Sequence, residues 1–474
     1  MNTQTPGLAP SAQRRNEPGI AAAIATLAPR FGDRLSLAEA IRAEHGRDEA
    51  HHAPQLPDAV IWPESTEEVA EIARTTSAHG CPLVAWGTGT SLEGHVLPVQ
   101  GGITLDFSRM DRVLAVHPED MDVVVQPGLR RVRLNEELRA TGLFFPIDPG
   151  ADASLGGMAS TRASGTAAVR YGTMREAVMA LEVVLADGRV IRTGSRARKS
   201  SAGYDLTRLF VGSEGTLGII TELTLRLHGI PEAITAATCA FDRVEDAVTT
   251  VIETIQSGVP VARIELLDAL TIRGFNAHSG YAMEERPTLF LEFHGSPTSV
   301  AEQAETVGAL AEANGGAGFD WTADPEARTR LWAARHQVYY AQQALRAGAK
   351  AYVTDICVPI SRLAEAIAET RVDLEDSPLM APLVGHVGDG NFHLSILIEP
   401  GVAAEKAEAQ RLAGRLSERA LRLGGTVTGE HGVGFGKRGL MEAEHGEAWQ
   451  VMGAIKQTLD PTGILNPGKL VPGN

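Results

Sequence analysis

The sequence predicts an α+β fold in two parts, for two reasons. Between residues 55 and 232, short apolar segments typical of strands are separated by turns and by glycine-rich loops. From residue 233 to 428, strands alternate with amphipathic helices, which is typical of an antiparallel or mixed sheet covered by helices. A chain of 474 residues is long enough for two or three domains with a large core.

The composition is that of a globular protein that does not bind nucleic acid. Hydrophobic residues make up 43% of the chain and charged residues 22%, and the formal net charge is -16. An acidic chain lacks the clustered Lys and Arg that bind nucleic-acid backbones. The most notable basic run, residues 196–199, is short and is interpreted as a solvated loop.

The cysteines and the apolar runs bear on location. Cys81, Cys239 and Cys357 are far apart and form no CxxC motif, which argues against a disulfide framework or a structural zinc site and favours a reducing compartment. No apolar run reaches the ~20 residues of a membrane span. We therefore expect a cytoplasmic protein with at most peripheral membrane contact.

The first 20 residues lack the apolar core of a secretion signal. They contain Arg14 and Arg15 with Glu17 as the only acid, so organelle targeting stays open, although a disordered tail is the simpler interpretation.

Residues 1–54 are expected to form an N-terminal helical segment. Two stretches, 19–32 and 36–50, have helical patterns. In the second, Ser36 is a plausible N-cap and Glu39 follows three residues later, which is the pattern of a capping box.

The domain expected over 55–232 opens with a short strand within 56–65. A helix over 65–80 then begins at Ser65 or Thr66 and ends at Gly80. The further expected elements are strands at 82–86, 102–108, 113–120 and 121–128, a helix at 132–142, a hairpin over 181–194 that turns at Asp187-Gly188, and a strand pair within 215–229.

The domain expected over 233–428 contains one long amphipathic helix, at 325–348. Its other expected elements are a strand and a helix within 239–258, a strand at 288–295, a helix at 299–316, a strand at 351–359 and a helix at 360–375. The remaining segment, 429–474, holds two glycine-rich stretches.

The first glycine-rich loop follows an apolar strand. Gly87 and Gly89 could aim backbone N–H groups at a phosphate. The Rossmann fingerprint fails because Leu92 stands where its third glycine is needed. The GxxxxGK[ST] loop fails because His95 follows Gly94. A phosphate loop of another fold and a plain tight turn both stay open.

The second glycine-rich region spans 148–173, and many small residues separate its five glycines. A backbone with so few side chains could lie along a long, flat ligand. Arg170 and Tyr171 add a charged group and a ring that could stack. A flexible linker is the alternative, but apolar strands on both sides argue against it.

The segment GHVGDGNFH, residues 385–393, brackets a glycine turn between His386 and His393. The turn excludes a helix, but a strand–turn–strand would let both imidazoles converge. Two histidines hold a divalent ion poorly, so a third ligand is needed.

The tripeptide Glu-His-Gly occurs at 44–46, 430–432 and 444–446. The first and last lie in helical stretches and are interpreted as surface residues. Glu430-His431 stands between glycines after an apolar segment, so we favour it as part of a site.

Seven segments together resemble one family of flavoproteins. The first four resemble the FAD-binding half of the vanillyl-alcohol-oxidase-like, PCMH-type flavoproteins, and the last three resemble the C-terminal half of their FAD-dependent D-2-hydroxyacid dehydrogenases, nearest to the cytochrome- or quinone-linked D-lactate dehydrogenases. The segments are residues 84–94, 148–165, 169–176, 211–221, 385–393, 428–438 and 459–469.

The resemblance implies a two-part PCMH-type FAD-binding domain at 55–232 and a substrate-binding cap domain at 233–428, with 429–474 returning to the FAD domain and active site. It implies that Gly87, Thr88, Gly89, Thr90 and Ser91 hold the pyrophosphate. It places along the rest of FAD the residues Gly94, Pro149, Gly150, Ala151, Gly156, Gly157, Ser160, Gly165, Tyr171, Gly215, Gly218, Ile220 and Asn466.

Relatives with covalent flavin carry a histidine in the first loop. The corresponding residue here is Thr90, and His95 lies five residues further on. We therefore predict non-covalent FAD.

The resemblance also implies the roles of the polar residues. His431 is the general base, Asn391 lies near the substrate hydroxyl, and Arg335 binds the substrate carboxylate, although an ordinary surface arginine is the alternative. The implied ligands of a divalent zinc, manganese or iron ion are His386, His393 and Glu430.

The chemistry uses both the metal and the base. A divalent metal can lower the pKa of bound water from ~15.7 to ~7, and it should favour an alkoxide in the same way. His431 would take the proton, and the hydride would pass to flavin N5 from ~3–3.5 Å. Because the sequence has no nicotinamide-binding loop, a quinone or a cytochrome is the expected electron acceptor. The sequence makes no prediction of the oligomeric state.

Relatives that act on D-2-hydroxyglutarate have a lysine where Val353 stands here. The loss of that charge favours D-lactate or a similar short D-2-hydroxy acid, with D-2-hydroxyglutarate or glycolate as alternatives. A metallohydrolase and a non-enzymatic flavin-binding module are the alternatives from other classes.

Overall fold

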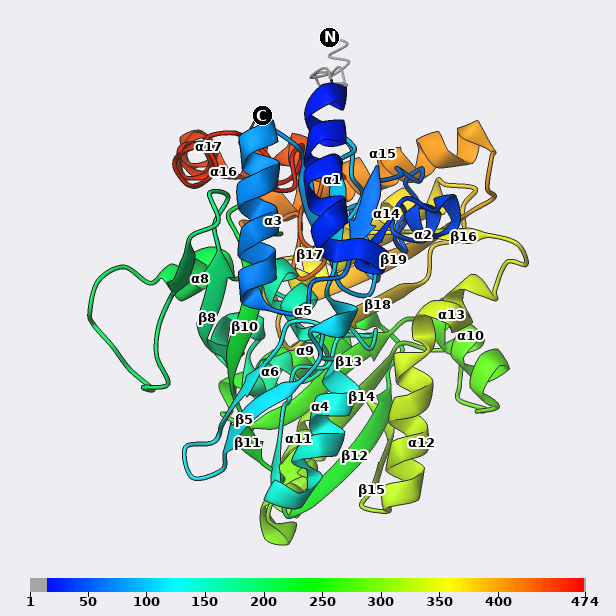
Figure 1. The fold of residues 1–474 in the computed structure, drawn as a ribbon. Coiled ribbons are helices and arrows are strands. Elements are labelled where there is room, and N and C mark those ends of the chain that lie inside the picture. Colours follow the sequence, from blue (N-terminus) through cyan, green and yellow to red (C-terminus); the bar gives the residue numbers. More distant parts are fainter. Residues whose placement is uncertain (1–14, 473–474) are drawn as a thin grey trace.

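The computed structural model describes residues 15–472, so the tail expected before them lies mostly outside the described residues. Figure 1 shows the first helices and the C-terminal helices at one end of the molecule, while the large sheet of the second half extends from the middle of the view to the other end. Within residues 15–472, no helix combines the length and apolarity that a bilayer crossing requires.

The first sheet has four strands in the order β1 (Leu35–Ser36), β2 (Ala59–Ile61), β4 (Ile103–Asp106) and β3 (Leu83–Trp86). Strands β2 and β3 run parallel to β4. Helices α1 (Glu17–Phe31) and α3 (Thr66–His79) pack side by side and share one apolar core with this sheet (Figure 1).

The predicted ends of α3 are confirmed, whereas the predicted capping box of the preceding helix is wrong. The hydroxyl of Ser65 accepts from the amide of Glu68, and Gly80 ends α3 in the left-handed conformation. Helix α2 (Glu39–Glu44) is capped by Ala38 and begins two residues late, because Ser36 belongs to β1 and pairs with Val60. Strand pairing has overridden a local helix signal.

The second sheet is antiparallel, in the order β5 (Val113–His117), β6 (Asp122–Val125), β10 (Ile219–Arg226), β8 (Val178–Val184) and β9 (Val190–Arg192). The predicted hairpin over 181–194 is confirmed. The strand pair predicted within 215–229 is wrong, because β10 is one continuous strand between β6 and β8. The residues before it form a loop, and a separate two-residue strand β11 (His228–Gly229) pairs with β7 (Leu143–Phe144).

Further helices complete this half and the C-terminal segment. They are α4 (Arg131–Leu138), α5 (Leu155–Thr161), α6 (Ala168–Tyr171), α7 (Met174–Ala177), α8 (Leu206–Phe210), α16 (Met441–His445) and α17 (Glu447–Leu459). The chain returns to the first sheet near its end, where Leu465 bridges Leu83 in parallel.

The second half is built on a sheet in which every strand pair is antiparallel. Its strands, in spatial order, are β15 (Ala317–Thr322), β12 (Ala233–Ala240), β14 (Thr288–Gly295), β13 (Val261–Leu267), β18 (Leu383–His386), β19 (Asn391–Ile398) and β16 (Lys350–Val353), with β17 (Ile356–Cys357) also on β19.

Helices cover both faces of this sheet. One face shares a core with α9 (Val244–Gln256), α11 (Pro297–Ala313), α14 (Leu363–Glu375) and α15 (Ala403–Arg422). The other shares a core with α10 (Ala269–Ser279), α12 (Pro325–His336) and α13 (Val338–Gln343).

The single helix predicted over 325–348 is two helices. Gln337 leaves the helical conformation, with φ -92° and ψ 8°, and ends α12 while it begins α13. After this bend α13 packs on α10, and Gln342 donates to the hydroxyl of Thr271 at 2.9 Å. The bend turns residues from both helices toward one cavity.

Candidate active site

A cavity of about 400 Å³ lies between the two halves of the molecule. One side is lined by the two glycine-rich loops and by residues 214–220, and the other by α12, α13 and the β18–β19 hairpin. Gly87 lets the two loops touch, because a Cβ on it would lie 2.1 Å from Oγ of Ser154. A cavity walled on one side by so many small residues fits a flat ligand such as FAD.

Most of the residues predicted to bind the cofactor line this cavity. They are Gly87, Thr88, Gly89, Thr90, Ser91, Pro149, Gly150, Ala151, Gly156, Gly157, Ser160, Gly165, Gly215, Gly218, Ile220 and Asn466.

Two predicted cofactor residues lie elsewhere. Gly94 packs against the ring of Phe435, which a Cβ on Gly94 would approach to 2.2 Å. The hydroxyl of Tyr171 lies 2.7 Å from Nδ1 of His294, and its ring meets Phe144 edge-on. Tyr171 therefore packs between the two halves instead of facing the cavity.

The strand–turn–strand predicted for residues 385–393 is confirmed. Strands β18 and β19 pair with His386 opposite Asn391 and Val384 opposite His393. Gly390 closes the turn with φ +80°. The imidazole centroids of His386 and His393 lie 5.5 Å apart.

Glu430 joins the two histidines. Its Oε1 lies 3.2 Å from Nε2 of His386 and 3.4 Å from Nε2 of His393. Burial would raise the pKa of Glu430, but the two histidines bring it well below its usual value. Two imidazole nitrogens aimed at one carboxylate form a donor set that fits a divalent ion.

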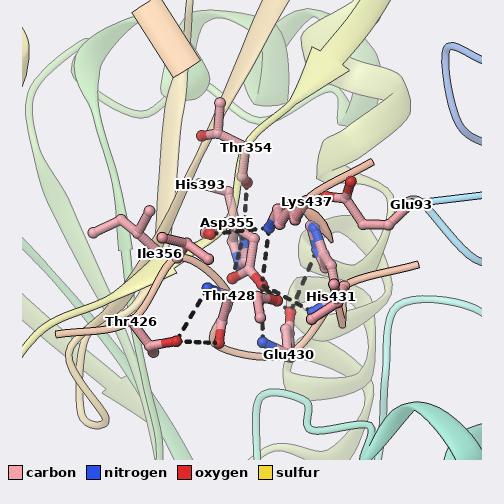
Figure 2. A network of polar contacts seen from close by, with 12 residues as sticks. Glu93, Thr354, Asp355, Ile356, His393, Thr426, Thr428, Glu430, His431 and Lys437 are labelled. Atoms are coloured by element: carbon pink, nitrogen blue, oxygen red, sulfur yellow. Dashed lines mark hydrogen bonds and ion pairs between the residues drawn. The ribbon is translucent and has the colours of Figure 1, made fainter. Parts of the chain in front are cut away.

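Asp355 holds the loop that carries Glu430, and Figure 2 shows it at the centre of a polar network. Its buried Oδ2 accepts the backbone N–H groups of Glu430 and His431, each at 2.9 Å, and the hydroxyl of Thr428 at 2.7 Å. Burial would raise the pKa of Asp355, but His431, Lys437 and these donors bring it well below its usual value. Asp355 therefore anchors the loop as a carboxylate.

Asn391, which we predicted near the substrate hydroxyl, belongs to this network instead. Its side-chain amide donates to Oδ1 of Asp355 and to the carbonyl of Ile356, both at 2.7 Å. The side chain is buried and does not line the cavity. Asn391 therefore supports Asp355 from behind the site.

His431 lines the cavity beside the candidate metal ligands. Its Nε2 lies 3.9 Å from Oε1 of Glu430. Its Nδ1 is buried without a hydrogen-bond partner among the described residues. Burial lowers the pKa of His431 to about 4 even though Asp355 opposes this shift. A neutral imidazole with an unpartnered nitrogen can accept a proton at neutral pH.

Arg335 also lines the cavity, on α12. It forms an ion pair with Glu265 of β13, and its Nε is buried without a partner among the described residues. The free donor fits an anionic group in the cavity.

Glu265 and Asp355 were missed by the sequence interpretation. Glu265 contacts both Arg335 and His386, and Asp355 contacts the 428–431 loop. The available signal was a carboxylate beside apolar, strand-forming residues, with Ile264 and Leu266 flanking Glu265 and Ile356 following Asp355.

Comparisons with known proteins identify the family of this chain. Residues 57–194 match the model of an FAD binding domain, and residues 230–470 match that of the C-terminal domain of FAD linked oxidases. The chain belongs to the FAD-linked oxidases. It is therefore an FAD-dependent oxidoreductase, as the sequence predicted.

Several curated relatives of this FAD-linked oxidase align along most of its length. A probable mitochondrial D-lactate dehydrogenase of Danio rerio is 51% identical over 92% of this chain and 89% of its own. A mitochondrial D-lactate dehydrogenase (cytochrome) of Arabidopsis thaliana is 48% identical over 90% and 76%. Glycolate oxidase subunit GlcD of Bacillus subtilis is 33% identical over 90% and 92%.

Solved structures confirm the predicted fold, a PCMH-type FAD-binding domain with a cap domain. p-Cresol methylhydroxylase superposes with a TM-score of 0.79 at 17% identity, over 96% of this chain and 97% of its own. 4-Ethylphenol oxidase from Gulosibacter chungangensis gives 0.77 at 19% identity, over 97% and 98%.

Proposed function

We propose that this FAD-linked oxidase oxidises D-lactate, or a similar short D-2-hydroxy acid, to the 2-oxo acid. The observation that carries the proposal is that His386, His393 and Glu430 converge beside His431 on the cavity of the FAD-binding domain. The names of the curated relatives support the substrate.

Three groups of this chain divide the work on the substrate. The unpartnered Nε of Arg335 binds the carboxylate, and His431 accepts the hydroxyl proton. The glycine-rich loops would hold FAD without a covalent bond, and the bound flavin would supply the two-electron oxidation at C2. His386, His393 and Glu430 would hold a divalent zinc, manganese or iron ion, whose charge would favour loss of the hydroxyl proton.

The cavity wall favours a short substrate. Val353 and Val384 line it, and the hydroxyl of Ser395 is turned to Gln342 at 2.7 Å. These groups offer no cation to a second carboxylate, which disfavours D-2-hydroxyglutarate. Glycolate stays a rival because of the Bacillus relative's name. Neither a metallohydrolase nor a flavin-binding module without activity makes use of all these groups.

The acceptor is proposed to be a cytochrome or a quinone. The name of the Arabidopsis relative supports the cytochrome. We keep the cytoplasmic, at most membrane-peripheral location as our proposal, whereas the curated D-lactate dehydrogenases are named as mitochondrial.

A substrate panel tests this function. Purified enzyme is mixed without oxygen with D-lactate, L-lactate, glycolate and D-2-hydroxyglutarate in turn, and bleaching of the flavin absorbance is followed. We expect D-lactate to reduce the flavin fastest and L-lactate to leave it oxidised. Faster reduction by glycolate or D-2-hydroxyglutarate would reassign the substrate.

Chelation tests the metal. Dialysis against a chelator, verified by metal analysis, should abolish reduction by D-lactate while the flavin stays bound, and added Mn²⁺ should restore it. Full activity in metal-free enzyme would remove the metal from the proposal.

A separate experiment identifies the acceptor. Metal-loaded enzyme that D-lactate has reduced is mixed with cytochrome c or with a soluble quinone, and reoxidation of the flavin is followed.

A further inference from the structure

Glu265 lies at the centre of the cap sheet and contacts two groups of the candidate site at once. Its side chain is 1% exposed. Its Oε1 lies 2.7 Å from Nδ1 of His386, and its Oε2 forms the ion pair with Arg335. We propose that Glu265 is a positioning residue that aims His386 at the metal and Arg335 at the substrate carboxylate, an inference that rests on the proposed function.

The contact with His386 selects its tautomer. A carboxylate beside Nδ1 keeps the proton on that nitrogen, so Nε2 presents its lone pair on the side of Glu430. His393 obtains the same orientation from a backbone group, since its Nδ1 lies 3.1 Å from the carbonyl of Thr354. A side chain lies farther from this nitrogen, with Oδ1 of Asp355 at 3.5 Å, so His386 is the one of the two histidines whose Nδ1 has a carboxylate within hydrogen-bond distance.

The contact with Arg335 fixes the guanidinium. Glu265 holds one terminal nitrogen, while the buried Nε has no partner among the described residues. An arginine held at one nitrogen keeps further donors in a fixed plane for a carboxylate. The same side chain thus ties the substrate anchor to the metal ligand.

This double role requires a carboxylate. Both oxygens of Glu265 accept, one facing the imidazole and one facing the guanidinium. An amide has a single acceptor oxygen, and its NH₂ group would face an N–H of either His386 or Arg335. Glu265→Gln therefore keeps the shape of the side chain but either breaks one of the two contacts or forces His386 into the tautomer whose Nε2 carries the proton and cannot bind a metal.

Glu292 on the neighbouring strand provides a matched control. Its carboxylate also joins a histidine to an arginine, at 2.8 Å from Nε2 of His294 and 3.1 Å from Nη1 of Arg263. Its side chain is 5% exposed, and it does not line the cavity. Both contacts are made by Oε1, whereas Glu265 uses one oxygen for each partner, so Glu292→Gln controls for the loss of a buried charge and leaves His386 and Arg335 untouched.

The experiment compares wild type, Glu265→Gln, Glu265→Asp and Glu292→Gln as holoenzymes. Each is stripped by a chelator and titrated with Mn²⁺, and free Mn²⁺ is followed by electron paramagnetic resonance. The KM for D-lactate and the thermal midpoint are measured on the same preparations.

For Glu265→Gln we expect a Mn²⁺ Kd that is about 10–100-fold higher, as is usual when a partner of a metal-binding histidine is lost, together with a raised KM. Glu265→Asp keeps both acceptor oxygens and should recover part of the Mn²⁺ affinity. Glu292→Gln should lower the thermal midpoint but leave the Kd and KM within a factor of about two.

Three outcomes would overturn the inference. One is a Glu265→Gln enzyme whose Kd and KM match wild type, and another is a Glu292→Gln enzyme that shifts them equally. A wild-type enzyme that binds no Mn²⁺ would overturn both the proposed metal site and the role of Glu265 toward His386, whereas the first two results would leave the metal site standing.

Discussion

The imidazole of His431 stacks on that of His393, with ring centroids 4.8 Å apart and planes inclined by 13°. This stack fixes the plane of His431 beside the candidate metal ligands, while its Nδ1 stays unpartnered among the described residues. A proton acceptor held in this way needs no rearrangement before it acts.

We therefore predict that His431→Ala lowers the rate of flavin reduction by D-lactate about 10²–10⁴-fold, the usual contribution of a general base. Stopped-flow absorbance measures this rate. The flavin content should stay at the wild-type level, and His445→Ala, in the last Glu-His-Gly tripeptide, serves as the control. A rate within tenfold of wild type would assign the proton to another group.

The Glu-His-Gly tripeptide at 44–46 gives a prediction on pH. His45 was expected at the surface, but it is buried, with 3% of its surface exposed. Its Nε2 lies 2.8 Å from Oδ2 of Asp106, and its Nδ1 lies 2.8 Å from the carbonyl oxygen of Ile41. Burial would lower the pKa of His45, but these partners raise it above 6.5. Both ring nitrogens donate in the protonated imidazole, so this site stabilises the charged form of His45.

A raised pKa in the folded state means that this ion pair stabilises the protein fully below pH 6.5 and is lost as the pH rises through the folded-state pKa. Hydrogen bonds to charged groups contribute about 1.5–3 kcal/mol. His45→Gln should therefore lower the thermal midpoint at pH 6 more than at pH 9. His445→Gln, whose imidazole is 32% exposed, should show no such difference. An equal loss at both pH values would mean that His45 is neutral.

The turn between the two metal-ligand candidates gives a prediction on stability. Gly390 has φ +80°, and a Cβ on it would lie 2.0 Å from the carbonyl oxygen of Val358. Gly401 has φ +91° with open space around it. Gly401→Ala should lower the free energy of unfolding by about 1–2 kcal/mol, the usual cost of a left-handed backbone conformation for a residue with a Cβ. Gly390→Ala should lower the free energy of unfolding clearly more, and it should also weaken Mn²⁺ binding. Denaturant unfolding measures both variants, and equal losses would contradict the steric argument.

Thr90 lies in the first glycine-rich loop, at the position where relatives with covalent flavin carry a histidine. The side chain of threonine has a hydroxyl group but no nucleophilic nitrogen that could bond to the flavin. We predict that acid precipitation releases all of the flavin into the supernatant, where absorbance measures it. A yellow pellet, or a fluorescent band in a denaturing gel, would show a covalent bond.

The parts of the candidate site that lie within a single loop could be predicted from the residues of that loop alone. The glycine spacing of 87–91 and the turn between His386 and His393 are properties of short segments, and the structure reproduces both. Glu265 and Asp355 act on residues 121 and 76 positions away, so their partners depend on how the sheet assembles. No local pattern contains that information.

The mistaken elements have similar causes. Ser36 has the pattern of a helix cap but pairs with Val60 as a strand. The helix ends at Gln337 although no glycine or proline stands there. It ends because the following residues, α13, change direction to pack on α10. Asn391 follows the glycine turn, yet its amide is used by Asp355. In each case a tertiary contact outweighs the local preference.

Both halves of the molecule hold the loop after Glu430. Glu214 of the FAD-binding domain accepts hydrogen bonds from the backbone N–H groups of Val433 and Gly434 at 2.7 and 2.8 Å. Asp355 of the cap accepts hydrogen bonds from the backbone N–H groups of Glu430 and His431. During synthesis these two carboxylates leave the ribosome long before their partners do. A nascent chain thus exposes both carboxylates, together with His386 and His393, before Glu430 and His431 follow, so the candidate site is completed only when the 430–434 loop emerges.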